Sequence, residues 1–210
     1  MRVLGISPIH DSSVAVINNG VLEYFCKEER LTREKRARHP LLSIDKAFKH
    51  AQGKIDFVVI SSPTKTDPLN HFLETYLSKK TKAKIIRLCD YHHLSHASLA
   101  FYNSGFKKCL AVVVDRNGSY FDRLRESESV FICSYPNYFE PIYKSFWLKH
   151  VGVVEDQLNL NKIIELKTFK NLGNCEISAD STMSITRVYE SATTLIGQNV
   201  LENGKTMGLA

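Results

Sequence analysis

The feature that most constrains the fold is a turn signal, Asn19-Gly20, inside the apolar and alternating stretch SVAVINNGVLEYFCKEE at residues 13–29. Asn and Gly accept the positive φ angles of a type I′ turn, which joins two antiparallel strands with the correct twist. The preceding run RVLGIS at residues 2–7 is short and apolar. The sequence therefore predicts that the chain opens with a three-stranded meander.

Helical and extended patterns alternate after the meander. Residues 41–52 have apolar side chains at helical spacing and end at Gly53, and residues 55–62 form an apolar strand pattern. The same alternation predicts the following elements: helices at 68–80 and 93–103, and strands at 83–90 and 109–115. This order predicts an α/β protein with a mixed sheet flanked by helices, in the ribonuclease H-like order of the actin-like ATPase superfamily.

We expect residues 1–115 to form a first ribonuclease H-like subdomain, with the first hairpin and the strand ending at Asp115 in one sheet. We expect residues 116–210 to begin a second subdomain that is incomplete. Within it, residues 129–135 resemble a strand, residues 135–147 the continuation of a hairpin, and residues 185–196 a helix. The glycine-bracketed end at 204–210 is typical of a connecting loop, so a truncated or split protein is expected.

Composition narrows the class of protein. The chain has 210 residues, of which 43% are hydrophobic and 24% charged, as in a globular domain with a substantial core. Five cysteines without a C-x-x-C pair favour reduced thiols. No signal peptide and no apolar run of about 20 residues is evident, so a cytoplasmic protein with no membrane partner is expected. The net charge of +6 leaves nucleic acid open as a partner, beside small anions such as nucleotides and acyl phosphates.

The strongest chemical signal is the segment Tyr91–Ala97, which holds three of the eight histidines. His92 and His96 are four residues apart, so a helix places both on one face. Asp115 ends an apolar strand pattern, and ligands of open α/β sheets lie beyond such strand ends. Two imidazoles and one carboxylate suit iron, manganese or zinc. The alternatives are a partly exposed histidine pair at a helix start and an Asp that begins a turn.

Three further residues are candidates for substrate contact. His10 lies in the turn after the first strand, where it can act as an acid–base or as a structural turn residue. Lys35 belongs to the basic stretch Lys27–Arg38 and can hold a phosphate or carbamoyl oxygen. The alternative is that this stretch is a solvated surface. Lys205 lies in Gly204-Lys205-Thr206, but a phosphate-binding P-loop requires glycine at position 199, which is Asn.

Four segments, in their order along the chain, resemble the O-carbamoyltransferases of the nodulation-factor and tobramycin type. They are His10–Ser13, Glu28–Lys35, His92–Ala97 with Ala100–Tyr102, and Gly204–Ala210. Leu31 replaces a family Phe, and Arg116-Asn117-Gly118-Ser119 replaces the family's Gly-x-Gly-Glu. The second departure places the acceptor and phosphate contacts in question, because Arg116 adds bulk and charge where glycine permits close backbone approach.

The resemblance implies transfer of a carbamoyl group from carbamoyl-adenylate, made from carbamoyl phosphate and ATP, to a hydroxyl of a small-molecule or nucleoside acceptor. It implies that His92, His96 and Asp115 hold a divalent metal, Fe2+ ahead of Mn2+ or Zn2+. It also implies that His10 is catalytic and that Lys35 and Lys205 bind the carbamoyl substrate. A downstream segment or second chain would supply a fourth ligand and the adenylate-forming module. The alternatives are an enzyme like the tRNA threonylcarbamoyl transferases, or a non-catalytic binding subunit of a split enzyme.

Overall fold

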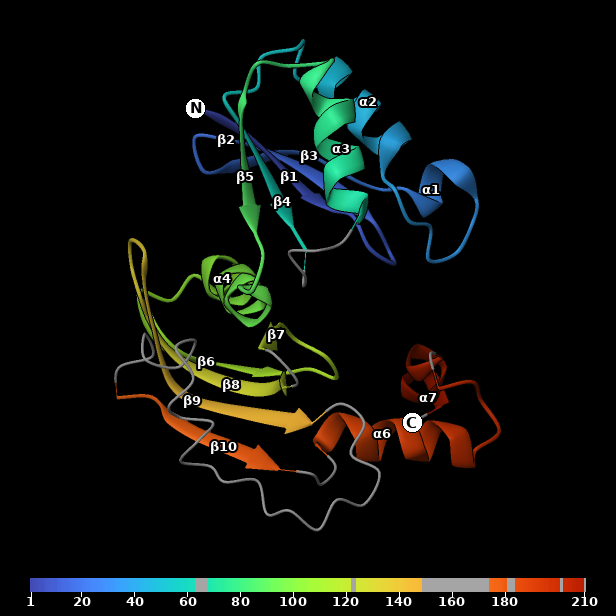
Figure 1. The fold of residues 1–210 in the computed structure, drawn as a ribbon, viewed down its shortest axis with the longest axis vertical. Helices are drawn as coiled ribbons and strands as arrows, with labels where there is room; N and C mark the ends of the chain where they lie inside the picture. The colour runs from blue at the N-terminus through green and yellow to red at the C-terminus, as the bar shows by residue number, and fades with distance from the viewer. Residues whose placement is uncertain (63–67, 122–123, 149–173, 181–183, 201, 210) are drawn as a thin grey trace. The chain divides into compact units, whose positions relative to one another are not determined.

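The computed structural model describes residues 1–62, 68–121, 124–148, 174–180, 184–200 and 202–209. The chain divides into two compact units, Met1–His92 and His93–Ala210 (Figure 1). The division falls at the first residue of a helix and not at the 115/116 boundary that we expected from the sequence. The assignment of residues 116–210 to an incomplete second subdomain stays a prediction.

The first unit contains a five-stranded mixed sheet in the order β3-β2-β1-β4-β5. Its elements are β1 (Arg2–Ser7), β2 (Ser13–Asn18), β3 (Val21–Lys27), α1 (Glu29–Thr32), α2 (Leu41–His50), β4 (Phe57–Ser61), α3 (Pro68–Ser78) and β5 (Lys84–Leu88). The first three strands are antiparallel, and β4 and β5 run parallel to β1. This is the predicted meander followed by helical crossovers, so the mixed α/β class with the ribonuclease H-like strand order is confirmed.

Local chemistry explains the hairpin that starts this sheet. Asn19 and Gly20 both have positive φ, at 47° and 84°, as the type I′ turn requires. Alternate side chains of the sheet then face α2 and α3, which lie over the same sheet face (Figure 1). The fully buried residues of this core include Leu4, Val16, Ile44, Ile60, Leu73 and Leu77.

The second unit contains a sheet in the order β10-β9-β8-β6, with β7 paired to β8. Its elements are α4 (His92–Ser104), β6 (Lys108–Val114), β7 (Tyr120–Phe121), β8 (Leu124–Ser134), β9 (Tyr138–Leu148), β10 (Glu176–Asp180), α6 (Ile185–Leu195) and α7 (Asn203–Leu209). A second core joins Ala97 and Phe101 of α4 to Val113 of β6 and to Phe131 and Cys133 of β8. This core fixes α4 against the strand that ends just before Asp115.

Two expectations from the sequence were wrong. The strand ending at Asp115 does not share a sheet with the first hairpin, because β6 pairs antiparallel with β8 along Lys108–Val114. Along β6, exposed residues alternate with buried or half-buried ones, as expected for a strand with one face of its sheet packed against a core. The glycine-bracketed end is also not a loop, since Asn203–Leu209 forms helix α7 despite Gly204 and Gly208.

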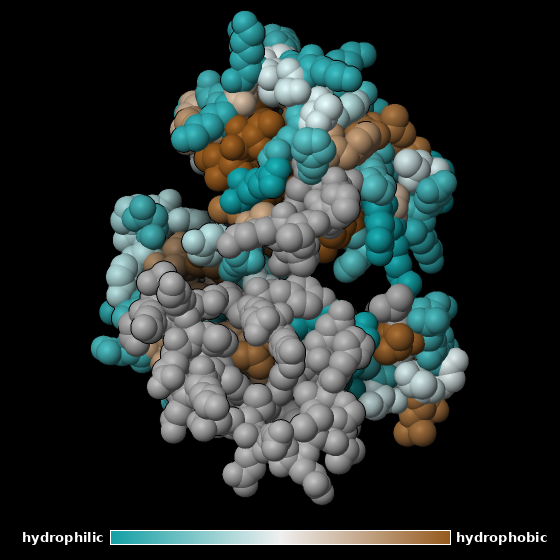
Figure 2. Space-filling view, in the orientation of Figure 1, coloured by the Kyte–Doolittle hydropathy of each residue, from teal (hydrophilic) through white to brown (hydrophobic). Residues whose placement is uncertain are grey.

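The surface carries the expected mixture of side chains. Hydrophilic residues dominate the viewed face of the first unit, beside a smaller hydrophobic patch (Figure 2). Among the described residues, no helix is both long and apolar enough to cross a bilayer.

Candidate metal centre

Helix α4 sets the spacing of the two candidate histidine ligands. His92 is its first residue and His96 lies one turn later. At 3.6 residues per turn, positions four apart share one helix face, so both imidazoles point to the same side. His96 is exposed and His92 is half-buried. The helix therefore presents a pair of imidazole side chains at its N-terminal end.

Asp115 is the first residue after β6, where several hydrogen bonds fix it. Its backbone N–H donates to the Ser127 carbonyl at 2.8 Å, which continues the pairing with β8. Its Oδ1 accepts the backbone N–H of Arg116 at 2.6 Å, and its carbonyl accepts the Thr186 hydroxyl at 3.4 Å. These hydrogen bonds fix the backbone of Asp115, and its carboxylate therefore lies at the end of β6.

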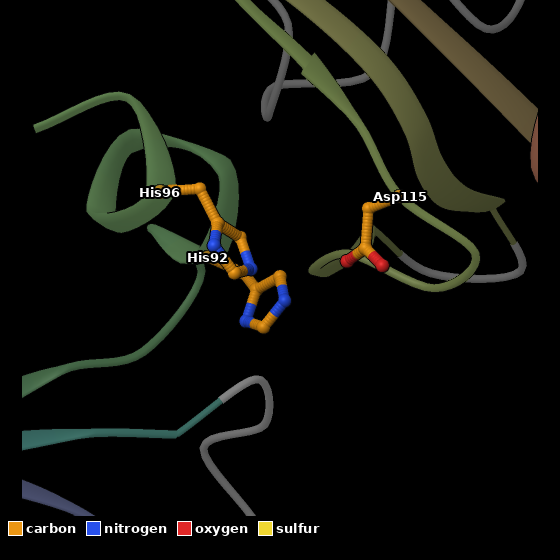
Figure 3. A group of neighbouring side chains, drawn as sticks. All are labelled: His92, His96 and Asp115. Atoms are coloured by element: carbon orange, nitrogen blue, oxygen red, sulfur yellow. The ribbon is translucent and has the colours of Figure 1, made fainter. Parts of the chain in front are cut away.

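The structure brings the three predicted metal ligands together. One ligand atom from each of His92, His96 and Asp115 lies within 4.8 Å of the others, and the imidazoles and the carboxylate face one another (Figure 3). Two imidazoles and a carboxylate on one side are a donor set that suits Fe2+, Mn2+ or Zn2+ and leaves coordination positions open. The residues present thus fit a divalent transition metal.

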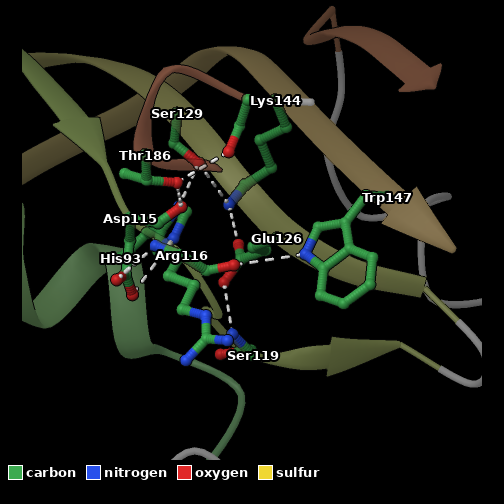
Figure 4. Close-up of polar contacts among 10 residues, drawn as sticks. His93, Asp115, Arg116, Ser119, Glu126, Ser129, Lys144, Trp147 and Thr186 are labelled. Atoms are coloured by element: carbon green, nitrogen blue, oxygen red, sulfur yellow. Dashed lines mark hydrogen bonds and ion pairs between the residues drawn. The ribbon is translucent and has the colours of Figure 1, made fainter. Parts of the chain in front are cut away.

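The middle histidine of the motif, His93, has a different role from its neighbours. It is fully buried, and its Nδ1 lies 2.7 Å from the Ser129 hydroxyl oxygen (Figure 4). Its Nε2 lies 4.0 Å from Oδ2 of Asp115. His93 therefore contacts Ser129 of β8 and approaches the Asp115 carboxylate from the buried side.

A buried ion pair continues this support. Lys144 and Glu126 are almost completely buried, and the Lys144 ammonium contacts the Glu126 carboxylate. Lys144 also donates to the Ser129 hydroxyl at 3.3 Å, and Glu126 Oε2 accepts the Ser119 N–H at 3.0 Å. Because a buried charge is tolerated only when it is paired and hydrogen-bonded, this network holds β8, β9 and the segment after Asp115 in one arrangement.

His10 lies in the turn between β1 and β2 of the first unit. Its ring is 65% exposed and its Nδ1 lies 3.0 Å from Oδ2 of Asp11. The pKa of the Asp11 carboxyl is lowered, chiefly by this hydrogen bond, against an opposing effect of burial and with help from Lys27. The Ser12 N–H donates to the Ala37 carbonyl at 3.0 Å, so this amide is used within the fold and not presented to a phosphate.

The two lysine candidates lie on different units. Lys35 is exposed in the segment between α1 and α2. Lys205 lies on α7 with a side chain that is 57% exposed and paired to Glu202. The roles of His10, Lys35 and Lys205 at a shared site stay predictions. The first hairpin and β6 lie in different sheets, so a common sheet does not support a place for His10 beside Asp115.

One group of residues was not predicted from the sequence. Trp147 on β9 lies under the guanidinium of Arg187 on α6, at 4.5 Å from cation to ring centre, and its indole N–H donates to the Arg116 carbonyl at 3.2 Å. These residues are distant in the sequence. In the sequence, only the replacement of a family glycine by Arg116 indicated that this part of the chain is unusual.

The fold and the three ligands define an α/β protein with a candidate metal centre. The chain matches none of the family models. It is 27% identical, over 195 aligned positions, to an uncharacterized protein of Methanocaldococcus jannaschii, with 80% of this chain and 37% of that protein covered.

Among solved structures, full-length HypF in its phosphate- and nucleotide-bound form matches 68% of this chain and 18% of its own, at 14% identity and a TM-score of 0.45. YeaZ from Pseudomonas aeruginosa matches 74% of this chain and 71% of its own, at 12% identity and a TM-score of 0.43. The chain thus spans 37% of the curated relative and 18% of the HypF chain.

Proposed function

We propose that this chain carries the metal-binding part of an O-carbamoyl transfer site. The observation that carries the proposal is the convergence of His92, His96 and Asp115, three residues that the motif resemblance selects as ligands, within 4.8 Å. The donor would be carbamoyl-adenylate formed from carbamoyl phosphate and ATP. The acceptor would be a hydroxyl of a small molecule.

The roles of the residues follow from their chemistry. His92 and His96 would hold the metal through neutral imidazole nitrogens, and Asp115 through a carboxylate that balances part of its charge. When bound, a divalent metal supplies Lewis-acid polarisation of the carbamoyl carbonyl. His93, Ser129 and Lys144 would keep Asp115 in position, because their contacts hold the strand end from the buried side.

His10 has the local geometry of a general base. An ionised Asp11 can only accept a hydrogen bond, so the Nδ1 of His10 is the donor in their 3.0 Å contact. In the neutral ring this leaves the Nε2 lone pair exposed. We propose that Nε2 takes the proton of the acceptor hydroxyl while its oxygen bonds to the carbamoyl carbon and the bond to the adenylate oxygen breaks.

Metal analysis of the purified chain tests the central part of the proposal. Equilibrium dialysis against Fe2+, Mn2+ or Zn2+ is expected to give one bound ion per chain. His96→Ala should weaken this binding by at least about 100-fold, since even groups that only orient metal ligands contribute about 10- to 100-fold. The matched control is His71→Ala, which removes an exposed histidine of α3 and should bind like the wild type.

The function itself is tested by carbamoyl transfer with the complete protein. His10→Ala should lower transfer to the acceptor by roughly 100-fold while its metal content stays at the wild-type level. Equal metal affinity of His96→Ala and His71→Ala would show that the ligands are misassigned. Unchanged transfer by His10→Ala would place the base elsewhere.

A further inference from the structure

The second unit contains a cavity apart from the candidate metal ligands. It is largely open to solvent, and its volume of about 670 Å³ is in the range of small-molecule sites. Its polar lining comes from Arg116, Arg187, Glu190, Ser191 and Thr194, and its apolar lining from Leu195 and Val200. The carbamoyl-transfer proposal assigns none of these residues a role.

Two guanidinium groups share one carboxylate in this cavity. Nε of Arg116 lies 2.6 Å from Oε1 of Glu190, and Nη1 of Arg187 lies 4.0 Å from Oε2. The Glu190 side chain is 7% exposed, whereas those of Arg116 and Arg187 are 36% and 31% exposed. Each guanidinium has five N–H donors, so one buried carboxylate cannot saturate both.

An aromatic ring places a third guanidinium beside them. The guanidinium of Arg187 lies 4.5 Å from the ring centre of Trp147, and that of Arg125 lies 5.6 Å from it. Burial lowers the pKa of Arg125, and the positive charges of Arg187 and Arg116 lower it further. Within the cavity lining, Arg116 and Arg187 carry two positive charges against the one carboxylate of Glu190.

We propose that this cavity binds the phosphate of a small phosphorylated molecule. A phosphate monoester carries about −1.5 to −2 charges at pH 7, so it is attracted to this pair of guanidinium groups more strongly than a single carboxylate is. Planar guanidinium groups bind phosphate oxygens in pairs. Leu195 and Val200 offer apolar contact to the rest of the ligand.

The cavity lies next to a candidate metal ligand in the sequence, which gives a bound phosphate a place near the proposed transfer site. Arg116 directly follows Asp115, and its N–H donates to the Asp115 carboxylate at 2.6 Å. A phosphate held by Arg116 is therefore one residue away from a candidate metal ligand. It belongs either to a phosphorylated acceptor or to a nucleotide donor. Phosphate binding itself does not depend on the proposed transfer reaction.

Isothermal titration calorimetry of the purified chain with inorganic phosphate, ribose 5-phosphate and AMP tests the inference. Arg187→Gln should weaken binding of all three by about 10-fold or more, as expected for lost hydrogen bonds to a charged group. Lys108→Gln removes one exposed positive charge of the same unit at a distance from the cavity lining and should bind like the wild type. Circular dichroism separates lost binding from lost folding.

A second variant has the opposite expected sign. Glu190→Gln keeps the shape of the side chain but removes the competing negative charge, so phosphate should bind more tightly, an effect that a damaged fold does not produce. Tighter binding of AMP than of ribose 5-phosphate identifies the nucleotide as the source, and equal binding identifies a phosphorylated acceptor. Failure of the wild type to bind any probe, or wild-type affinity in Arg187→Gln, overturns the inference. His96→Ala should retain phosphate binding, so this result is independent of the metal proposal.

Discussion

At the scale of single residues, Gly118 shows how tightly the segment after Asp115 is packed. A Cβ atom at this position would lie 2.4 Å from Nε2 of His93 and 2.7 Å from the Cβ of Glu126. Both neighbours are buried and hydrogen-bonded, so neither can move away at low cost. The requirement for glycine here comes from packing.

Gly118→Ala should therefore lower the free energy of unfolding by about 1–3 kcal/mol, the usual cost of overpacking a buried site. It should also weaken metal binding, because a displaced His93 no longer supports Asp115. Urea denaturation and the dialysis assay measure the two effects. Gly204→Ala is the matched control, since a Cβ there meets open space within helix α7 and alanine favours helices. Equal stability of the two variants would contradict the packing argument.

A residue within the motif that resembles the carbamoyltransferases has a structural role as well. Glu28 is 2% exposed, and its Oε1 and Oε2 accept the backbone N–H groups of Leu42 at 3.0 Å and Ser43 at 2.8 Å. These are N–H groups of the first turn of α2, which begins after Pro40 without a side-chain cap of its own. Glu28 caps this helix from a distant point in the sequence.

At the scale of the element, Glu28→Ala should destabilise α2. One buried and one partly buried N–H group lose a charged acceptor, and the expected loss in free energy of unfolding is about 3 kcal/mol. Glu29→Ala is the control, because its contact with the Arg36 N–H is long at 3.4 Å, and it should cost less than about 0.5 kcal/mol. Urea denaturation followed by circular dichroism compares them. A small loss for Glu28→Ala would mean that water replaces the cap.

A second link between elements depends on pH. Glu74 of α3 binds the guanidinium of Arg87 on β5, and this hydrogen bond lowers the pKa of the Glu74 carboxyl below its ordinary value of 4.5, although burial opposes the shift. A lowered pKa means that the contribution to stability is present above pH 4.5 and is lost as the pH falls through the folded-state pKa.

We therefore expect the free energy of unfolding of the wild type, measured in urea, to be lower at pH 3 than at pH 6. In Glu74→Gln this difference should be smaller. The variant lacks the titrating group, so its stability should depend less on pH in this window. The same pH dependence in both proteins would show that the ion pair contributes nothing measurable, as many exposed pairs do.

Local patterns predicted most elements, and long-range contacts account for the rest. The hairpin at Asn19-Gly20 and helix α2 follow from turn chemistry and helical spacing over a few residues. The pairing of β6 with β8 could not be predicted, because an apolar strand does not specify its partner. Likewise, His92 and His96 were predictable from one helix, whereas the contact of Trp147 with Arg187 joins two elements without a shared local pattern.

At the scale of the whole molecule, the chain is two compact units, each with its own core. The first unit contains His10, Lys35 and the capped helix α2. The second contains Asp115, Lys205 and the cavity proposed to bind phosphate. The chain spans only 37% of the curated relative that it matches.

The adjacency of Asp115 and Arg116 has a thermodynamic consequence. The Arg116 N–H donates to the carboxylate that is proposed to hold the metal, and the Arg116 side chain lines the cavity. If binding of one ligand moves this peptide, the free energy of binding the other changes. Such coupling is reciprocal: the factor by which a metal ion alters phosphate affinity must equal the factor by which phosphate alters metal affinity. When both ligands are present their affinities would then be coupled, whereas the metal-free chain would still bind phosphate.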